Sequence, residues 1–298
     1  MMLRAARMYG RVAPWKRGKH FLVRAVTPLL HEQQIVVVET IYGSRFRLRF
    51  PEDVGWERLY VLGSYETGTS ALAAAVLEPG DVVLDVGANL GWYSILFDRC
   101  VRPSGSVHAF EPVPWIRQKF EENCLLNGVG AGVVLNEVGV GASPGTLTLC
   151  TFAELSHGET SGKPFAGAHI ASQVSASCIT LDQYVSATHL DHVALIKVDI
   201  EGGEQDVVSG SASLLSRTRP PMWILEVNFR NAAAFGWSPP DLLRRLQQDH
   251  DYRFIRIPSG WHEPVHVHRI EECEHGDNVL CYRADAHTDR VSRWKRPL

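Results

Sequence analysis

The sequence predicts an α/β protein with one mostly parallel β-sheet that carries helices on both of its faces. From residue 81 onward, short apolar runs typical of buried parallel strands alternate with segments typical of helices. A chain that alternates strands and helices in this way forms a parallel sheet covered by those helices. The composition agrees, because 45% hydrophobic and 21% charged residues in a chain of 298 suffice for a large buried core.

The first 58 residues differ from the rest. Residues 1–30 contain no acid and seven basic residues, namely Arg4, Arg7, Arg11, Lys16, Arg17, Lys19 and Arg24. Because basic residues interrupt every apolar stretch, this segment does not fit a secretory signal. We expect residues 1–58 to form a basic, solvated and partly disordered arm followed by a hairpin over 35–50; contact with a membrane surface or an acidic partner is the alternative. Residues 59–298 then form the main domain, with its core at 79–230.

Apolar runs and helix start and stop signals give the elements of the main domain. A short helix is expected over 67–78, before Pro79-Gly80. The strands are expected at 81–88, 106–113, 133–140, 146–153, 192–203, 221–228, 252–257 and 278–284. The further helices are expected at 91–101, at 115–128, from Glu204 onward, and from Pro239 onward with Ser238 as N-cap.

Residues 154–177 are polar and show no periodicity. A long irregular segment inside an α/β domain is typical of a lid or substrate loop, and a variable insertion is the alternative. His157 and His169 in this segment are candidates for substrate contact or for a base, on loop position alone. Asp182, in the stretch TLDQY, is expected to cap the short helix after it.

Charge and cysteine content exclude several classes of function. The formal net charge of −3 gives no overall attraction to polyanions, so nucleic acid is not an expected partner. No apolar run reaches the roughly 18 residues that span a bilayer, so no transmembrane segment is expected. The six cysteines are scattered without a CxxC pair, which is typical of core thiols in a reducing compartment. We therefore expect a cytoplasmic protein, and leave open whether it is a homo-oligomer.

The turn Asp85-Val86-Gly87-Ala88-Asn89-Leu90-Gly91 joins the first strand of the sheet to its helix. Ligands of such sheets bind at the carboxyl ends of the strands. The dinucleotide fingerprint G-x-G-x-x-G does not fit, because Asn89 stands at its second glycine. Asp85 would also place a negative charge beside a diphosphate, at a cost of roughly 1 kcal/mol or more if partly buried. An NAD-dependent oxidoreductase is therefore disfavoured.

S-adenosylmethionine has the opposite requirements, since it carries an ammonium and a sulfonium and no phosphate. Asp85 is then favourable, and Gly87 and Gly91 permit a close approach of the backbone. Glu111 ends the second strand, where an acid can accept hydrogen bonds from both ribose hydroxyls, and Pro112 fixes the chain beyond it. Taken singly, Asp85 could cap the turn and Glu111 could be an exposed strand end. Their joint placement favours the cofactor.

At these motifs the sequence resembles the FkbM family of class I methyltransferases. The resemblance covers roughly residues 60–230 and rests on Tyr65-Glu66, PGDVVLDVGANLGWYS (79–94), FEP (110–112), Asn136, TLDQY (180–184) and IKVDIEGGE (196–204). It implies a Rossmann-like, mostly parallel sheet of seven strands with an antiparallel last strand. It also implies methyl transfer mainly to hydroxyl oxygens of sugars, polyketides or other secondary metabolites. The residues expected to bind the cofactor are Tyr65, Glu66, Asp85, Gly87, Ala88, Asn89, Gly91, Tyr93, Glu111, Pro112, Asn136 and Asp199.

Three acids are candidates for catalysis. Asp199 and Glu201 end the fourth strand, beside the cofactor strand, and share one face if that strand is regular. Glu226 ends the next strand. Acids in apolar strands are costly unless they are paired, so we expect them to serve a hydroxyl acceptor that benefits from a base. Glu204 falls in the first turn of a helix, where an acid suits the helix dipole.

No metal is expected, but two alternatives stay open. The three candidate acids could bind Mg²⁺, since hard cations take carboxylate oxygens. His262, His266 and His268 lie in an expected late hairpin and could bind a metal, although a solvent-facing strand is the preferred interpretation.

These observations predict an S-adenosylmethionine-dependent O-methyltransferase that acts on a hydroxyl of a small natural product or sugar. The alternatives are methylation of a nitrogen, a carboxylate or a macromolecule, and a non-catalytic module that binds the cofactor. Methylation of adenine amino groups is disfavoured, because enzymes of that kind often carry an Asn/Asp-Pro-Pro-aromatic motif where this chain has Asp199-Ile200-Glu201-Gly202.

Overall fold

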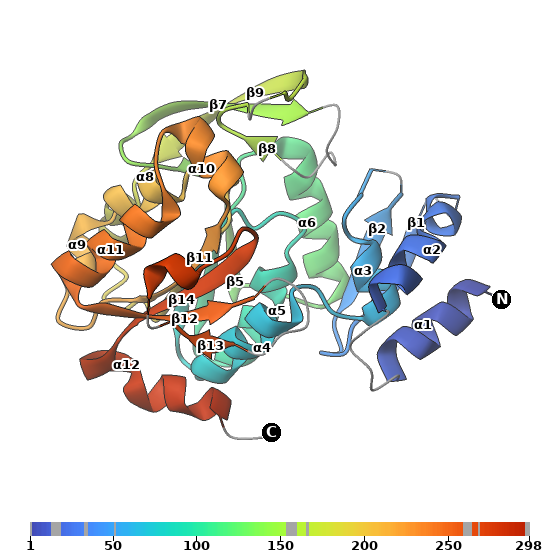
Figure 1. Cartoon of the computed structure of the whole chain (residues 1–298), viewed down its shortest axis with the longest axis horizontal. Coiled ribbons are helices and arrows are strands. Elements are labelled where there is room, and N and C mark those ends of the chain that lie inside the picture. Colours follow the sequence, from blue (N-terminus) through green and yellow to red (C-terminus); the bar gives the residue numbers. More distant parts are fainter. Residues whose placement is uncertain are drawn as a thin grey trace.

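An eight-stranded sheet with the order β13-β12-β14-β11-β10-β3-β4-β5 organises the fold (Figure 1). The structure is a computed structural model that describes residues 2–12, 19–32, 35–50, 52–152, 160–164, 167–258, 264–267 and 269–295. The strands of this sheet are β3 (Val82–Val86), β4 (Ser106–Phe110), β5 (Val133–Asn136), β10 (Leu195–Val198), β11 (Met222–Val227), β12 (Tyr252–Ile257), β13 (Val265–His266) and β14 (Asp277–Arg283).

The topology confirms the predicted fold class. Strands β5, β4, β3, β10 and β11 run parallel, and β14 runs antiparallel to β11 and to β12. The sheet has one strand more than the seven expected, because the two-residue strand β13 pairs with β12 at its edge. The strand order reverses between β3 and β10, so the carboxyl ends of these two strands lie at a topological switch point.

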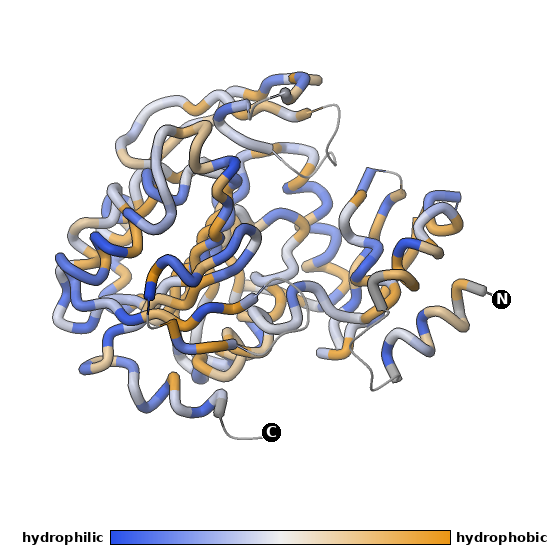
Figure 2. The backbone as a smooth tube through the Cα atoms, in the orientation of Figure 1, coloured by the Kyte–Doolittle hydropathy of each residue, from blue (hydrophilic) through white to orange (hydrophobic). Residues whose placement is uncertain are grey.

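Helices cover both faces, and the alternation of strand side chains divides the core between them. Val83 and Leu195 pack on the side of α4, α5 and α12, whereas Leu84 and Ile196 pack on the side of α7, α8, α9 and α11. The strands form the most hydrophobic part of the trace in Figure 2. The helices are α1 (Met2–Val12), α2 (Lys19–His31), α3 (Glu57–Leu62), α4 (Thr67–Val76), α5 (Trp92–Val101), α6 (Pro114–Leu126), α7 (Leu181–Ala187), α8 (Glu204–Ser209), α9 (Ala212–Leu215), α10 (Phe229–Phe235), α11 (Pro239–His250) and α12 (Ala284–Val291).

The N-terminal segment is folded where it is described, which overturns the expectation of a solvated and partly disordered arm. Helices α1 and α2 pack on each other and on α3 (Figure 1). Val26 and Leu30 of α2 are buried in the core, and the basic residue Arg7 donates to the Glu39 carbonyl. The predicted hairpin is confirmed as β1 (Ile35–Glu39) and β2 (Arg45–Arg49), which pair antiparallel.

The expectation of a long irregular loop over 154–177 is wrong for most of its described part. A second sheet, of order β6-β9-β7-β8, contains β6 (Gly139–Val140), β7 (Gly145–Phe152), β8 (Thr160–Ser161) and β9 (Ile170–Ile179). The ten-residue β9 pairs with β7 along almost its whole length. Most of its side chains are exposed, so hydrophobic alternation gave no signal of a strand. The expected third strand also divides, since β5 joins the main sheet and β6 joins the second one.

Asp182 does not cap the helix in which it lies. Thr180 is the N-cap of α7, and its side chain forms a capping box with Gln183. The Asp182 carboxylate instead accepts hydrogen bonds from the backbone N–H groups of Ser213 (2.8 Å) and Leu214 (3.1 Å), at the start of α9. The N–H groups of a helix start have no partner within the helix, so a distant acid meets this need.

The structure also bears on the expectations about cysteines and about membrane-spanning segments. All six cysteines are free. Within the described ranges, no helix combines the length and the apolar character that a bilayer crossing requires.

Candidate functional site

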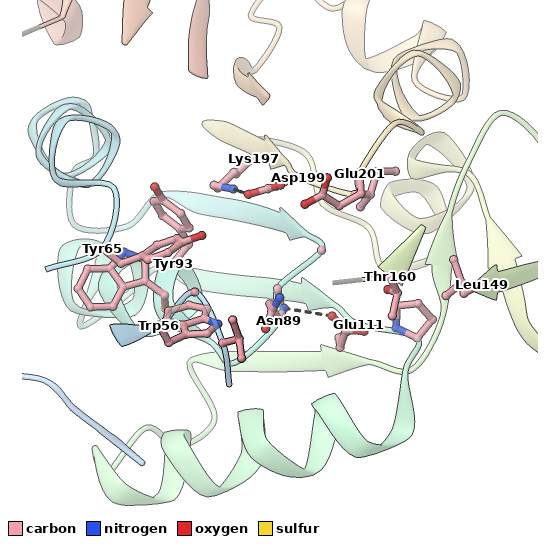
Figure 3. Close-up of a pocket in the computed structure, with 17 residues that line it drawn as sticks. Trp56, Tyr65, Asn89, Tyr93, Glu111, Leu149, Thr160, Lys197, Asp199 and Glu201 are labelled. Atoms are coloured by element: carbon pink, nitrogen blue, oxygen red, sulfur yellow. Dashed lines mark hydrogen bonds and ion pairs between the residues drawn. The ribbon is translucent and has the colours of Figure 1, made fainter. Parts of the chain in front are cut away.

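A cavity opens at the switch point, above the turn that joins β3 to α5 (Figure 3). We call it the turn cavity. The predicted residues that line it are Tyr65, Gly87, Ala88, Asn89, Tyr93, Glu111, Pro112, Asp199 and Glu201. In Figure 3, Lys197, Asp199 and Glu201 follow one side of the cavity, and Asn89 and Glu111 lie on the opposite side. The structure therefore brings the turn after β3 and the acids after β10, which are far apart in the sequence, to the same cavity.

The turn has a backbone that glycine makes possible. Gly87 has φ +83° and Asn89 has φ +50°, both in the left-handed region. The N–H groups of Gly87 and Ala88 both donate to the carbonyl of Phe110, which ties the turn to the end of β4. A Cβ atom on Gly87 would lie 2.0 Å from the Asp199 carbonyl oxygen. The expected reason for this glycine was approach to a ligand; the structure shows that it also lets the ends of β3 and β10 meet.

Glu111 stands at the end of β4 and is held in place by the turn. Its Oε2 accepts from the Asn89 N–H (3.1 Å), and its Oε1 accepts from the Val113 N–H (3.0 Å). Burial raises the pKa of this carboxyl to about 7, although both backbone donors oppose the rise. Each carboxylate oxygen has a second lone pair, so the group can still accept hydrogen bonds from two hydroxyls of a ligand.

Asp85 lies under the turn and is not part of the cavity wall. It is buried, and its Oδ2 accepts a hydrogen bond from the Ser94 hydroxyl at 2.6 Å. Its cross-strand neighbour on β10 is Lys197. Burial raises the pKa of Asp85 to about 6, and the positive charge of Lys197 limits the rise. Asp85 therefore does not contact a ligand in the turn cavity directly, and its negative charge can attract a cation there only from a distance.

Lys197 is a site residue that sequence reasoning missed. Its side chain is buried, its ammonium lies 2.7 Å from Asp199 Oδ2, and the same nitrogen lies 4.3 Å from the centre of the Tyr93 ring. The negative charges of Asp199, Glu66 and Asp85 raise the pKa of this lysine despite its burial. A signal existed, because a lysine within an apolar strand, two residues before an acid, shares that acid's side of the strand.

Aromatic side chains and one acid form the wall on the side of α3 and α4. Tyr65 stacks on Trp56 with ring centroids 4.4 Å apart, and Trp56 was not predicted. The carboxylate of Glu66 accepts from the Tyr93 hydroxyl (2.6 Å) and from the Asn278 amide (3.2 Å). Glu66 does not line the turn cavity but a neighbouring one, which it shares with Asn278 and Tyr65. Burial raises the pKa of Glu66, and Lys197 opposes that rise.

The three candidate catalytic acids meet at the ends of β10 and β11. One carboxylate oxygen from each of Asp199, Glu201 and Glu226 lies within 4.8 Å of the others. The expected reason, a regular strand through residue 201, is wrong, because β10 ends at Val198 and Glu201 has φ +57°. Glu201 Oε2 accepts instead from the side-chain amides of Asn228 (3.3 Å) and Asn231. Partners on α10 and before it therefore hold Glu201 in place.

Glu204 does more than complement the dipole of α8. It lies in the first turn of that helix, and its Oε1 accepts from the N–H groups of Gly202 (3.1 Å) and Ile200 (3.3 Å). The side chain thus closes the turn that carries the candidate acids. Burial raises the pKa of Glu204 to about 7, and the bond from Gly202 opposes the rise.

The other predicted residues lie around the cavity or outside the described chain. Gly91 is the N-cap of α5, and the Asn136 amide donates to the Ala109 carbonyl at 3.0 Å. His169 is exposed next to β9, and His266 lies near Trp294. His157, His262 and His268 lie outside the described residues. Thr160 and Leu149, from the second sheet, line the turn cavity and were not predicted.

An apolar cavity adjoins the turn cavity on the far side of Pro112. The two share Gly87, Pro112, Leu149 and Ile200 as walls, and Val138 and Phe110 are among the residues that complete the apolar one. A ligand that occupies both cavities would therefore contact apolar walls in one of them and the carboxylates of Glu111, Asp199 and Glu201 in the other.

This arrangement fits S-adenosylmethionine. The carboxylates of Glu111, Asp199 and Glu201 face the turn cavity, and Lys197 is the basic residue among its described walls. Such a wall favours a ligand with positive charge, as the ammonium and the sulfonium have, and disfavours a diphosphate. Glu111 offers acceptors to the ribose hydroxyls, and the apolar cavity offers room for a flat ring.

Comparison with known proteins identifies the family. The family model described as "Methyltransferase FkbM domain" matches residues 85–254. Relatives include methyltransferase sdnD of Sordaria araneosa, with 26% identity over 63% of this chain and 79% of that protein. The 31-O-demethyl-FK506 methyltransferase FkbM of Streptomyces tacrolimicus is 28% identical over 45% of this chain and 60% of its own length. The hexuronic acid methyltransferase AglP of Haloferax volcanii is 25% identical over 58% and 66%.

The matched family region covers 170 of the 298 residues and begins at Asp85, the first residue of the turn. It contains the turn, Glu111 and the three acids at the ends of β10 and β11. The chain is thus a methyltransferase of the FkbM family, and its cofactor is S-adenosylmethionine.

Proposed function

We propose that this protein transfers the methyl group of S-adenosylmethionine to a hydroxyl oxygen of a small polyhydroxylated molecule, such as a natural product or a sugar. The observation that carries the proposal is the cluster of Asp199, Glu201 and Glu226 at the end of the turn cavity. A hydroxyl must lose its proton during methylation, and a carboxylate in reach of it supplies a base worth about 10²–10⁴ in rate.

Within the cluster, the two acids that line the turn cavity are the candidates for the base. Asp199 is held by Lys197, and Glu201 is held by two amides, so both are fixed in position. Glu226 is not among the cavity walls. Burial and the negative charges of its neighbours raise the pKa of Glu226 well above the usual range. An acid outside the cavity walls does not reach the acceptor hydroxyl, so Glu226 is not a candidate for the base.

Orientation supplies the other part of the catalysis. Methyl transfer is an in-line displacement, in which the acceptor oxygen, the methyl carbon and the sulfur have to lie on one line. Holding reactants in such a geometry can supply up to about 7–11 kcal/mol in the best cases. In this chain, Glu111 fixes the ribose, and the aromatic wall of Trp56, Tyr65 and Tyr93 bounds the cavity on the side of α3 and α4.

The names of two relatives support a small acceptor, and one of these names supports oxygen as the methylated atom. One relative is a 31-O-demethyl-FK506 methyltransferase, and another is a hexuronic acid methyltransferase. The second candidate function, methylation of a nitrogen or of a macromolecule, has no comparable support from the cavity, whose acids match a hydroxyl that has to be deprotonated.

A transfer assay with methyl-labelled S-adenosylmethionine tests the proposal. Purified protein is incubated with a panel of hydroxylated acceptors, and mass spectrometry of the products locates the new methyl group. We expect an O-methylated product. If Asp199 is the base, Asp199→Asn should lower kcat at least about a hundredfold. The control Asp191→Asn should keep full activity, because the Asp191 side chain is exposed. Label found on nitrogen, or full activity in both Asp199→Asn and Glu201→Gln, contradicts the proposal.

A further inference from the structure

We propose that Asp199, Glu201 and Glu226 bind one divalent cation with oxygen ligands, such as Mg²⁺, Mn²⁺ or Ca²⁺, next to the turn cavity. The binding itself follows from the geometry of the cluster. The part that the cation plays in methyl transfer rests on the proposed function.

The spacing of the carboxylates suits such an ion. Their ligand oxygens lie within 4.8 Å of one another. Two oxygens on opposite sides of Ca²⁺, each at 2.3–2.6 Å, are about 4.6–5.2 Å apart, and for Mg²⁺ at 2.0–2.1 Å they are about 4.0–4.2 Å apart. The limit of 4.8 Å lies within the span of two oxygens on a calcium-sized ion and slightly above the span for Mg²⁺.

A second observation points to a ligand at this place. Glu226 Oε2 is completely shielded from solvent and has no hydrogen-bond partner among the residues that the structure describes. A buried carboxylate oxygen without a donor is costly, because it has lost its water and gained nothing in return. A cation between Glu226 and the other two acids would supply the missing interaction.

The surroundings hold two of the acids as ligands are held. Lys197 binds Oδ2 of Asp199, and the amides of Asn228 and Asn231 bind Oε2 of Glu201. Outer contacts of this kind orient metal ligands in proteins, and their loss typically costs 10–100-fold in affinity.

The cofactor cannot take the place of this ion. Asp199 and Glu201 line the turn cavity, but Glu226 is not among its walls. The sulfonium and the ammonium of S-adenosylmethionine are part of the molecule that we place in the turn cavity, so they do not reach Glu226. A small ion is therefore the cationic group that can contact all three carboxylates at once.

A cation at this position predicts the class of acceptor. Three protein oxygens leave open positions on an ion that takes six or more ligands. Two neighbouring oxygens of one acceptor, as in a vicinal diol, can occupy them. A hydroxyl bound there would lose its proton more easily, and the proton would pass to water, because Lys197 and the cation would engage the Asp199 carboxylate. Its O–H bond breaks as the O–CH₃ bond forms, and the electron pair of the S–CH₃ bond stays on sulfur to give the neutral thioether.

Binding of Mn²⁺, measured by electron paramagnetic resonance of the free aquo ion, tests the site without any methyl acceptor. The protein is titrated in the presence of S-adenosylhomocysteine, and binding of that nucleoside is measured on the same samples by calorimetry. We expect one Mn²⁺ per chain, displaced by excess Mg²⁺ or Ca²⁺. Glu226→Gln, which keeps the shape and removes the charge, should weaken Mn²⁺ at least about tenfold and leave nucleoside binding within about twofold.

Two further variants control the result. Glu271→Gln removes an exposed acid far from the cluster and should bind Mn²⁺ as the parent does. If Glu226→Gln does not fold, as a lost melting transition would reveal, Glu201→Gln takes its place. Only its Mn²⁺ affinity is then compared with that of the parent, because Glu201 also lines the turn cavity. No Mn²⁺ binding at millimolar concentration, or equal affinity in the parent and the cluster variants, overturns the proposal. In that case nucleoside binding and O-methylation can still be intact, so failure of the metal site and failure of the proposed function are distinguishable.

Discussion

Replacing Lys197 with methionine is expected to destabilise the fold strongly, because this buried lysine balances the negative charges of Asp199, Glu66 and Asp85. Its ammonium is buried, lies 2.7 Å from Asp199 and faces Asp85 across the strand pair β3–β10. Removing one partner of a buried ion pair costs about 3–5 kcal/mol, since the other charge stays buried without compensation. The Asp199 side chain is 25% exposed, so solvent screens part of this loss and a value of about 3 kcal/mol is expected.

The loss should depend on pH with a defined sign. Burial already raises the pKa of Asp85 in the folded protein to about 6, and Lys197 works against that rise. Without the lysine, the folded-state pKa of Asp85 rises further. A carboxyl that holds its proton more tightly in the folded state loses stability as pH rises from its unfolded pKa, near 4, through the folded pKa. The deficit of Lys197→Met should therefore be smaller at pH 5 than at pH 8.

Urea unfolding at pH 5 and pH 8, followed by circular dichroism and by tryptophan fluorescence, measures this deficit. Lys163→Met replaces an exposed lysine and should change the free energy of unfolding by less than about 0.5 kcal/mol. The double variant Lys197→Met/Asp199→Asn should recover part of the loss, because both members of the pair are then neutral. A loss below about 1 kcal/mol at pH 8, or an equal loss at both pH values, would refute the reasoning.

Three other changes test separate parts of the site. Gly87→Ala should lower the free energy of unfolding by at least about 2 kcal/mol and abolish nucleoside binding, because its Cβ would lie 2.0 Å from the Asp199 carbonyl oxygen. The control Gly236→Ala, at φ +84° with open space around it, should lower it by only about 1–2 kcal/mol. Equal losses of stability in thermal melts of the two variants would contradict the clash. Glu111→Gln should weaken S-adenosylhomocysteine about tenfold to a hundredfold in calorimetry. In the parent protein, the affinity for S-adenosylhomocysteine should rise as pH increases through the Glu111 pKa of about 7, because the ionised carboxylate accepts hydrogen bonds from both ribose hydroxyls. If Glu111→Gln keeps the same pH dependence, Glu111 is not the group that causes it. Asp182→Ala should lower the free energy of unfolding by about 1 kcal/mol, because α9 loses the carboxylate that caps it. The control Asp191→Ala should leave the free energy of unfolding unchanged. Equal stability of the two variants in urea unfolding would disprove the capping role.

Local motifs are the part of the site that could be predicted from the sequence. The turn at Asp85–Gly91 and the acid at Glu111 are set by short stretches, in which glycine permits a left-handed backbone and an apolar run defines the strand. Because parallel strands bring their carboxyl ends to one edge, the meeting of Glu111 and Asp199 at the turn followed from the order of the elements. Helix α8 began at Glu204 as expected.

Features that depend on partners far apart in the chain could not be predicted. Strand β9 has mostly exposed side chains, and the hydrogen bonds that make it a strand come from β7. Asp182 caps a helix that begins 30 residues later, at Ala212. The N-terminal basic helices looked solvated because the apolar partners of α2 lie on α3 and beyond.

The sequence by itself determined the fold class, the cofactor turn and the acids that face it, because each of these depends on residue type and spacing within one strand, turn or helix. The tertiary structure alone decided how the acids are held. Lys197 meets Asp85 only through the register of β10 on β3, Asn231 reaches Glu201 from α10, and Asn278 reaches Glu66 from β14. The charge balance of a buried site is a sum over side chains from distant segments, and only folding brings those segments within the few ångströms at which charges compensate one another.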